Sequence, residues 1–381
     1  MKYFMLFLMA AGVILLGAGP AAASESRIGA MGDVGLFTED NTSILTYPGD
    51  ILQYRDLLTL ELRTKSVDNV YTVNGNFGLG RKLVLGGYVN QPLSIPVPAA
   101  ALGTFSNITL DRTLQVILGI PLARRNLGLS LNVGLDNYVS ESGGTRTEQS
   151  GYSISLMGGL SDASMDLSAA VHVPSFEASV GSAKTTLSGF GLGLNGRIFL
   201  GKDEELKLVP IFHLSYSSAA SKSGSTTTTK YNQIDFRTGL GVNYKFMKNN
   251  LLVMGFEARF DQDVVEVVPN PTSTVTDRVI TFPGIYCGVE SQLTKWMTGR
   301  AGAIQRYNLV LARTEAAGTA ESSNWNSPFT FTLGTAINWG QFIIDASLNE
   351  DLFFEGPDFI TGNGAAGSDF AQTISVIYSL K

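Results

Sequence analysis

The sequence predicts an all-β fold, a transmembrane antiparallel up-and-down β-barrel of 16 strands in a bacterial outer membrane. Three observations lead to this prediction. The N-terminus is that of an exported protein, apolar residues recur at every second position over long segments, and short turns alternate with long polar stretches. A count of 14 strands is the alternative, because the earliest strands are the least regular.

Composition excludes several classes of protein. The 381 residues include 27 basic and 33 acidic side chains, so the net charge is −6 with His neutral, and charged residues make up 16% of the chain. Soluble domains usually have about 25%. No basic block offers nucleic acid an electrostatic footprint. The one cysteine, Cys287, excludes an intramolecular disulfide framework and a cysteine zinc cluster. The low charge and the 42 glycines favour a membrane or extracytoplasmic protein.

The N-terminus indicates export. Lys2 precedes an uncharged apolar run over residues 3–19, and three alanines end at Ala23. A positive start, an apolar stretch and small residues are typical of a secretory signal peptide, which we assign to residues 1–23. An uncleaved helical anchor is the alternative. No later segment has the roughly 18 consecutive apolar residues of a membrane-spanning helix.

Alternation of apolar and polar residues predicts the strands. Along residues 232–247 the even positions are mainly large and apolar, whereas the odd positions are glycine, polar or charged. Residues 127–135, 190–198 and 329–339 repeat the pattern. These segments exceed the usual sandwich strand of about 5–6 residues and approach or reach the roughly 9–11 residues of a tilted membrane strand. The large side chains would face lipid and the small and polar ones a hydrated lumen.

The spacing of turns gives the topology. Short turns are expected at residues 80–82, 123–126, 161–163, 201–205, 248–250, 294–295 and 340. Long loops are expected at residues 90–110, 138–150, 174–185, 218–231, 266–277, 312–325 and 349–369. A first hairpin (57–63 and 71–79), a strand at 82–89 and a closing strand at 370–380 complete the 16 and leave both termini in the periplasm. The periplasmic aromatic girdle is expected at Tyr244, Phe246, Trp296 and Trp339.

Charged residues fall on the inward parity of these strands. Arg or Lys on the lipid face costs about 2–4 kcal/mol near the midplane, so a stable barrel requires this segregation even without a functional role. The lumen-lining candidates for transport are His213, Asp235, Arg237, Glu257, Arg259, Asp261, Arg300 and Arg306. The same parity places Glu61, Arg63, Arg197, Lys207, Lys245, Arg278, Glu290 and Asp345 inward. Both signs are present, so strong selectivity between anions and cations is not indicated.

One hairpin allows a register to be predicted. A three-residue turn at residues 248–250 pairs residues whose numbers sum to 498. Arg237 would then lie opposite or diagonal to Asp261, with Glu257 and Arg259 on the same inner face.

Residues 24–56 precede the first strand and contain no long alternating segment. They include Ala30-Met31-Gly32-Asp33, the acidic pair Glu39-Asp40 and Tyr47-Pro48-Gly49. This stretch resembles the start of the OMPP1/FadL/TodX and PorV-like outer-membrane barrels, which have an Ala-x-Gly-Gly-like turn, an acidic pair and an Asn-Pro-Ala-like step. The resemblance implies a hatch-like segment in the lumen, marked here by Ala30, Gly32, Asp33, Glu39, Asp40 and Pro48. It also implies passage of hydrophobic compounds or, in the PorV-like branch, a role in protein secretion.

The composition of this segment is a separate reason to place it inside the barrel lumen. Ile28, Met31, Val34 and Phe37 make it too apolar for a solvated tail, and so few residues rarely fold alone. Room for the segment is expected at the inward glycines Gly189, Gly191, Gly193, Gly239 and Gly241. A periplasmic tail that recruits a partner is the alternative.

The expected function is passive passage of a small solute, hydrophobic if the resemblance holds, through a barrel of residues 57–381. The alternative is a non-conducting scaffold or secretion partner whose extracellular loops bind a protein. No enzyme, cofactor or metal site is expected, because His172 and His213 lack a nucleophile motif and the carboxylates lack calcium-loop spacing. The expected partners are outer-membrane lipid and the solute, with a protein partner under the alternative and no nucleic acid.

Overall fold

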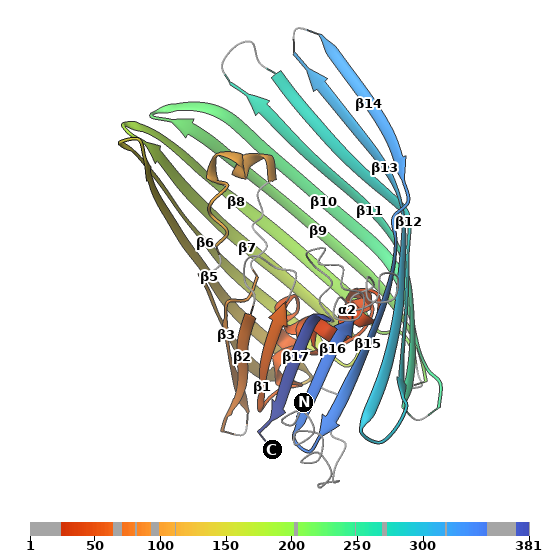
Figure 1. Ribbon diagram of the computed structural model, residues 1–381. Helices are drawn as coiled ribbons and strands as arrows, with labels where there is room; N and C mark the ends of the chain where they lie inside the picture. The colour runs from red at the N-terminus through yellow and green to blue at the C-terminus, as the bar shows by residue number, and fades with distance from the viewer. Residues whose placement is uncertain are drawn as a thin grey trace, which may run out of the picture.

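A closed barrel of antiparallel strands surrounds a short N-terminal helical segment in the computed structural model (Figure 1). The structure describes residues 24–380, apart from residues 64–70, 81, 93–98, 111, 202–204, 248, 269–272, 317 and 349–370. The signal peptide predicted for residues 1–23 lies outside the described residues. Within the described part of the chain, no helix has the length and apolar character needed to cross a membrane.

Sixteen strand positions close the barrel, as predicted, so the alternative of 14 is wrong. The strands are β1 (Leu57–Arg63), β2 (Tyr71–Leu79), β3 (Leu83–Val89), β4 (Arg112–Leu122), β5 (Arg125–Ser142), β6 (Thr145–Asp162), β7 (Met165–Val180), β8 (Ala183–Ile198), β9 (Leu206–Ser223), β10 (Thr226–Lys245), β11 (Asn250–Val267), β12 (Ser273–Gln292), β13 (Met297–Glu315), β14 (Thr319–Asn326), β15 (Phe329–Trp339), β16 (Phe342–Leu348) and β17 (Ala371–Ser379). β14 and β15 share one position, because both pair with β13 in a single register. β17 pairs with β1, with Ser379 opposite Leu57, and this contact closes the sheet.

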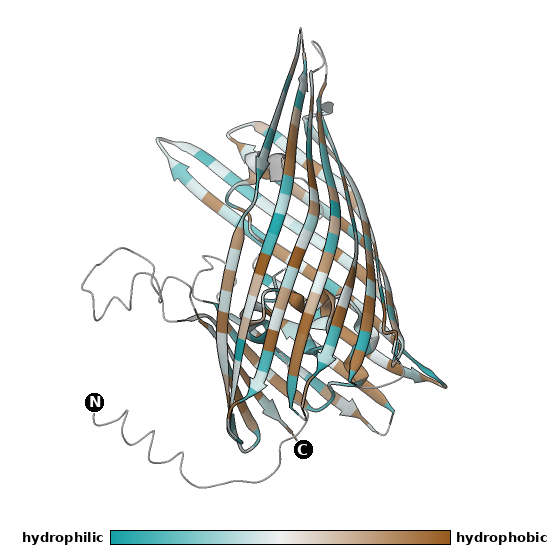
Figure 2. Cartoon of the chain, turned by 90° about the vertical axis from the view of Figure 1, so that its right-hand side faces the viewer, coloured by the Kyte–Doolittle hydropathy of each residue, from teal (hydrophilic) through white to brown (hydrophobic). Residues whose placement is uncertain are grey.

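The two faces of the wall follow the predicted parity. Leu240 on β10 is 46% exposed on the outer face, whereas Asp235 on the same strand is buried on the inner face. Figure 2 shows apolar and polar residues alternating along the strands. Tyr244, Trp296 and Trp339 are exposed beside the short turns, as expected for the periplasmic girdle.

The structure contradicts five of the expected long loops, those at residues 138–150, 174–185, 218–231, 266–277 and 312–325. Most of their described residues belong to strands, and the first three are closed by turns of only two residues, such as Gly143–Gly144. These hairpin ends are rich in Ser and Thr and lose the apolar alternation above the membrane, but their backbones still pair, and Thr favours strands. The stretch 90–110 contains the short helix η4 (Ala99–Phe105), and the stretch 349–369 lies outside the described residues.

The register predicted for the β10–β11 hairpin is also wrong. Lys245 lies opposite Leu251, so opposed residues sum to 496. The turn takes up five residues instead of three, and Met247 within it has a φ of 58°. Arg237 therefore faces Arg259 and is diagonal to Asp261, which is one of the two arrangements predicted, and Glu257 and Arg259 share its inner face as predicted.

The inward position predicted for Arg278 is wrong because β12 contains a bulge. The pairing of β12 with β13 shifts between Thr281 and Gly284, which inverts the parity above the bulge. Arg278 lies opposite Gln262, which in turn lies opposite Ile234 on the lipid-facing side of β10. Its side chain is consequently on the outer face of the wall.

We expect Leu240→Arg to lower the stability of the folded barrel by about 2–4 kcal/mol, because the substitution places a charge on the lipid face. Leu240→Phe, which keeps an apolar side chain at the same place, is the control. The measurement is the urea midpoint of folding into lipid vesicles. Equal midpoints for the two variants would contradict the assignment of this face to lipid.

Candidate functional site

A segment before the first strand lies inside the lower half of the barrel (Figure 1). We call residues 24–54 the plug; its helices are α2 (Glu25–Ala30), η1 (Val34–Leu36), η2 (Asn41–Leu45) and η3 (Pro48–Leu52). Polar caps begin two of these helices. The Ser24 hydroxyl accepts a hydrogen bond from the Arg27 backbone N–H, and the Asp40 carboxylate accepts from the N–H groups of Thr42 and Ser43.

Glycines on the inner wall leave space for the plug to lie against the strands. A Cβ atom at Gly302 would overlap the amide nitrogen of Gly32, and one at Gly128 would overlap the carbonyl of Pro48. The wall glycines that a Cβ would push against the plug are Gly86, Gly119, Gly128, Gly159, Gly241, Gly255, Gly288, Gly302 and Gly334. Of the glycines expected to leave room for the segment, Gly241 contacts Phe37 of the plug, whereas Gly189 and Gly239 lie against neighbouring wall strands.

Hydrophobic contacts also hold the plug against the wall. Met31, Val34 and Phe37 of the plug form one buried cluster with wall residues of β9, β11, β12 and β13. Ile44 and Ile51 form a second buried cluster with residues of β3 and β4. The plug therefore contacts the wall on both sides of the lumen.

One ion network ties the start of the plug to the wall. The guanidinium of Arg27 holds the Glu290 carboxylate with two contacts, Nε to Oε2 at 2.7 Å and Nη2 to Oε1 at 3.1 Å. The same carboxylate pairs with Arg300 at 2.6 Å, and Arg300 also pairs with Asp345. The Ser24 hydroxyl donates to Asp345 at 2.9 Å. Arg300, a predicted transport residue, thus belongs to the plug anchor.

A second network is centred on Arg197 of β8, whose side chain has no exposed area. Its Nε contacts Asp166 at 2.6 Å, and its Nη2 contacts Asp50 of the plug at 3.2 Å. Its Nη1 donates to the Thr38 carbonyl oxygen at 2.7 Å, and the guanidinium carbon lies 4.6 Å from the centre of the Tyr47 ring. One wall cation therefore holds three parts of the plug.

Burial raises the pKa of four plug carboxyls, Asp33, Glu39, Asp40 and Asp50. For Asp50 the neighbouring Asp166 carboxylate raises the pKa further, and Arg197 opposes the change. Arg27 opposes the change at Asp40, and Arg306 opposes it at Asp33. The docked plug consequently binds protons more tightly than a solvated segment would.

The remaining hatch-like residues also lie against the wall. Each of three hatch-like residues lies against a wall glycine: Ala30 against Gly334, Gly32 against Gly302, and Pro48 against Gly128. The Asp33 backbone has a φ of 52°, in the left-handed region where Asp is tolerated.

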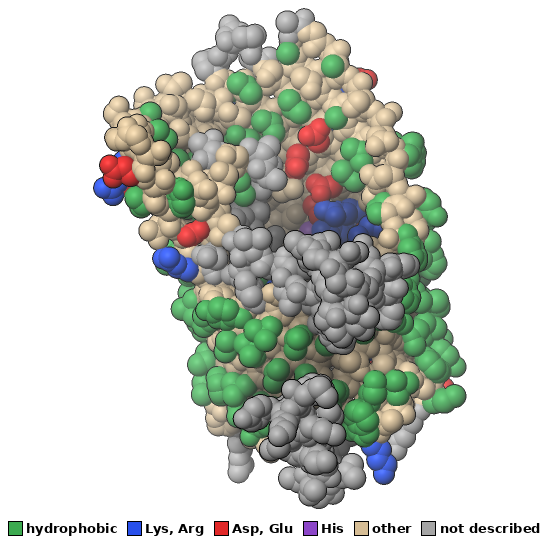
Figure 3. Space-filling model, in the orientation of Figure 1, with side chains coloured by type: hydrophobic (Ala, Val, Ile, Leu, Met, Phe, Trp, Pro, Cys, Tyr) green, Lys and Arg blue, Asp and Glu red, His purple; other side chains and the backbone are tan. Residues whose placement is uncertain are grey.

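Above the plug, the inner wall of β10 and β11 is charged. Asp235 pairs with Arg237 at 2.8 Å and with Arg259 at 2.9 Å, and Arg259 pairs with Asp261 at 2.7 Å. Like charges face each other directly across the two strands, so the ion pairs run diagonally or along one strand. Figure 3 shows the upper half of the molecule hollowed, with acidic and basic side chains on its inner surface. We call this region the charged chamber.

Three other predicted residues border the chamber. Arg306 donates from Nε to the Tyr286 hydroxyl at 3.2 Å, and that hydroxyl donates to Glu257 at 3.3 Å. Arg306 makes no ion pair among the described residues. His213 Nδ1 lies 2.6 Å from Asn195 Oδ1. The other histidine, His172, contacts the Ser155 hydroxyl.

A second segment inside the lumen was not anticipated. η4 and the residues after it pack against an apolar part of the upper inner wall, where the Phe105 and Phe176 ring centres are 5.6 Å apart. Wall residues Phe176, Leu187 and Tyr231 are buried there on the inward parity. Large apolar residues on the polar face of the strands were the sequence signal for this contact.

Comparisons with known proteins add little to this geometry. No family model matches, and no curated protein matches. Among solved structures, the toluene transporter TodX of Pseudomonas putida has a TM-score of 0.38 at 10% identity, over 93% of this chain and 97% of that one. The translocator domain of the autotransporter NalP of Neisseria meningitidis has 0.31 at 11%, over 68% and 89%. The siderophore receptor PirA of Pseudomonas aeruginosa has 0.31 at 6%, over 84% and 79%.

The barrel itself decides the class. Its sheet closes on itself where β17 pairs with β1, its membrane-spanning outer face is apolar, and its inner face is mainly polar. The chain is a bacterial outer-membrane β-barrel. The solved structures named above assign it neither a family nor a solute.

We expect Arg197→Met to lower the stability of the docked plug by about 3–5 kcal/mol, because Asp50 and Asp166 would be left buried without a cation. Arg146→Met, which removes an exposed ion pair with Glu148, should change stability by about 0–1 kcal/mol. The measurement is the urea dependence of protease cleavage within residues 24–54. Equal dependence in both variants would contradict the role of Arg197.

The raised carboxyl pKa values predict how docking depends on pH. A solvated Asp titrates near 3.8, and in the docked plug the value is higher, so protonation favours docking. This contribution is fully present below pH 3.8 and is lost as the pH rises through the raised pKa. We expect protease cleavage of the plug to increase as the pH rises from 3.8 through the raised pKa values, and Asp50→Asn to reduce that increase. A response of the same size in Asp50→Asn would contradict the assignment.

Proposed function

We propose that the protein admits a small solute into the charged chamber from outside and passes it to the periplasm when the plug moves. The observation that carries the proposal is that, at the level of the plug, the wall does not fill its own lumen. Several inward residues there are glycines, and a separate segment of chain occupies the space. Barrels of about 16 strands leave an aqueous channel unless something fills it.

The contacts of the plug suit a closure that can be displaced. They are hydrogen bonds, ion pairs and packing contacts, and both ion networks join charged groups of the plug to charged groups of the wall. Displacing the plug therefore exposes charged groups that water in the lumen can solvate. This offsets part of what is lost when the contacts break.

The route favours an amphipathic solute. It would pass the apolar upper contacts around Phe105 and Phe176 and then the chamber, where cations and carboxylates alternate. The first zone is covered by η4, so it would hold an apolar part of the solute once η4 moves from the wall, and the second zone would hold a polar or charged group. The resemblance of residues 30–49 to the FadL-type barrels supports a solute with an apolar part.

The second candidate is a non-conducting scaffold that binds a protein through its extracellular ends. The observation in its favour is the length of the hairpins of β5–β13, which extend beyond the apolar belt; β14 is exposed along its whole length. Conductance separates the two functions, because a scaffold needs no passage.

We expect the double variant Gly128→Ala/Gly302→Ala to conduct more than the native protein in a planar bilayer. The added methyl groups overlap the plug backbone at Pro48 and Gly32; the one at Gly302 would also lie 2.6 Å from the Thr332 hydroxyl of β15, which can rotate away. Gly193→Ala is the control, since its Cβ would be 3.8 Å from the nearest atom, in Ala170. Equal conductance in the native protein, the double variant and the control would contradict a plug that closes the lumen by packing against these glycines.

Deletion of residues 26–48 tests passage itself. We expect this variant to show a large, steady conductance, because the wall leaves the lumen open at that level. A closed baseline in a correctly folded deletion variant would favour the scaffold.

A further inference from the structure

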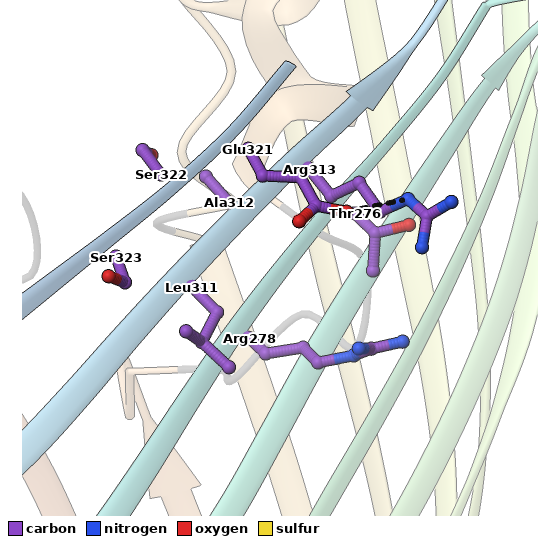
Figure 4. Close-up of a pocket in the computed structure, with 8 residues that line it drawn as sticks. All are labelled: Thr276, Arg278, Leu311, Ala312, Arg313, Glu321, Ser322 and Ser323. Carbon is purple, nitrogen blue, oxygen red and sulfur yellow. Dashed lines mark ion pairs between the residues drawn. The ribbon is translucent and has the colours of Figure 1, made fainter. Parts of the chain in front are cut away.

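A cavity of about 260 Å³ lies on the outer wall near the extracellular ends of β12, β13 and β14 (Figure 4). It is lined by Thr276, Arg278, Leu311, Ala312, Arg313, Glu321, Ser322 and Ser323. It belongs to neither the plug nor the charged chamber. Nothing proposed above for passage uses it.

The pairing of the strands places the cavity on the lipid-facing side. Arg278 lies opposite Leu311, and Leu311 lies opposite Ser323, so the three share one face. Two residues further along β14, Trp325 has the same parity and is 68% exposed. The opposite face of β12 carries Thr281, which is buried and donates to Asn308 inside the barrel.

The cavity also lies directly above an apolar zone. The row of residues below Arg278 and Leu311 contains Ile280, Leu309 and Trp325. Phe282 lies two residues further down β12 and is exposed. Large exposed aromatic residues are typical of the membrane interface, so Arg278 and Arg313 lie at the level of lipid headgroups.

The two arginines that line the cavity differ in their ion pairs: Arg313 has carboxylate partners, whereas Arg278 has none among the described residues. Arg313 pairs with Glu315 at 2.5 Å and with Glu321 at 3.5 Å, and all three side chains are at least half exposed. Arg278 donates from Nε to the neutral amide oxygen of Gln262 at 2.7 Å and has no carboxylate partner among the described residues. Its terminal N–H groups are therefore available to an anion from outside the chain.

We propose that this cavity binds a phosphate group on the headgroup of an outer-leaflet glycolipid. A guanidinium binds phosphate with two parallel hydrogen bonds, and Arg278 can offer such a pair of N–H groups. Thr276 and Ser323 supply hydroxyl donors on the same face. Glu321 can leave Arg313 at little cost, because exposed ion pairs contribute only about 0–1 kcal/mol.

The apolar row below the cavity points to a lipid instead of free phosphate. A lipid phosphate held by Arg278 would place its acyl chains over Ile280, Leu309 and Trp325. Free phosphate would gain nothing from those residues. The apolar contact and the charged contact therefore select one molecule that carries both groups.

The test uses the full chain in detergent and native mass spectrometry with lipid A that carries both phosphates. We expect Arg278→Gln to weaken binding about tenfold, which is the loss of one charge-assisted hydrogen bond. Arg112→Gln is the matched control. Arg112 also lies on the outer face beside an exposed leucine, Leu114, and donates to a neutral amide, Asn137, but it does not line this cavity. We expect that variant to bind as the native chain does.

Three results would overturn the proposal. Equal losses in Arg278→Gln and Arg112→Gln would mean that the lipid responds only to general positive charge. Equal binding of lipid A from which the phosphates have been removed would exclude phosphate recognition. Full competition by inorganic phosphate at millimolar concentration would indicate a site for the free ion. Unchanged heat-modifiable migration on gels shows that each variant is folded, so a loss of binding is not a loss of the barrel.

Discussion

The width of the lumen is the constraint on which the rest of the structure depends. Sixteen strands enclose more space than their own inward side chains fill, and at the level of the plug several of those positions carry only hydrogen. The chain fills the space with its own N-terminal segment, whose backbone approaches the wall at Gly128 and Gly302. These positions are therefore glycine because the plug backbone needs the space, and not because the strands need glycine.

Charge adds specificity to this fit. Arg27 and Arg197 are both buried where the plug meets the wall: Arg27 of the plug binds Glu290 of β12, and Arg197 of the wall binds Asp50 of the plug. Buried ion pairs contribute little net stability, but a misplaced plug would leave these charges unpaired, at a cost of several kcal/mol. Hydrophobic clusters supply attraction, and the ion networks fix where α2 and η3 dock.

Alternation in the sequence predicted the membrane-spanning strands and their two faces, because lipid imposes period two on each strand, and the spacing of the turns predicted the count of 16. It failed above the membrane, where both faces are polar and the long hairpins resembled loops. It also failed at Arg278, since a bulge between Thr281 and Gly284 inverts the parity; Pro283 and Gly284, residues typical of bulges, are the sequence signal for it. The charges of the chamber, such as Arg237, could be assigned to the lumen, but their partners depend on a register that the turn at Met247 sets.

Locking the plug to the wall tests the central claim most directly. The hydroxyl oxygens of Ser26 and Ser375 are 2.6 Å apart, so cysteines at both positions can form a disulfide between α2 and β17. In a Cys287→Ala background, we expect the double cysteine variant to oxidise in the folded barrel and to give a closed baseline in a planar bilayer. Reduction should restore openings like those of the native chain. Failure of the bridge to form in folded protein, or identical conductance before and after reduction, would contradict a plug that closes the lumen.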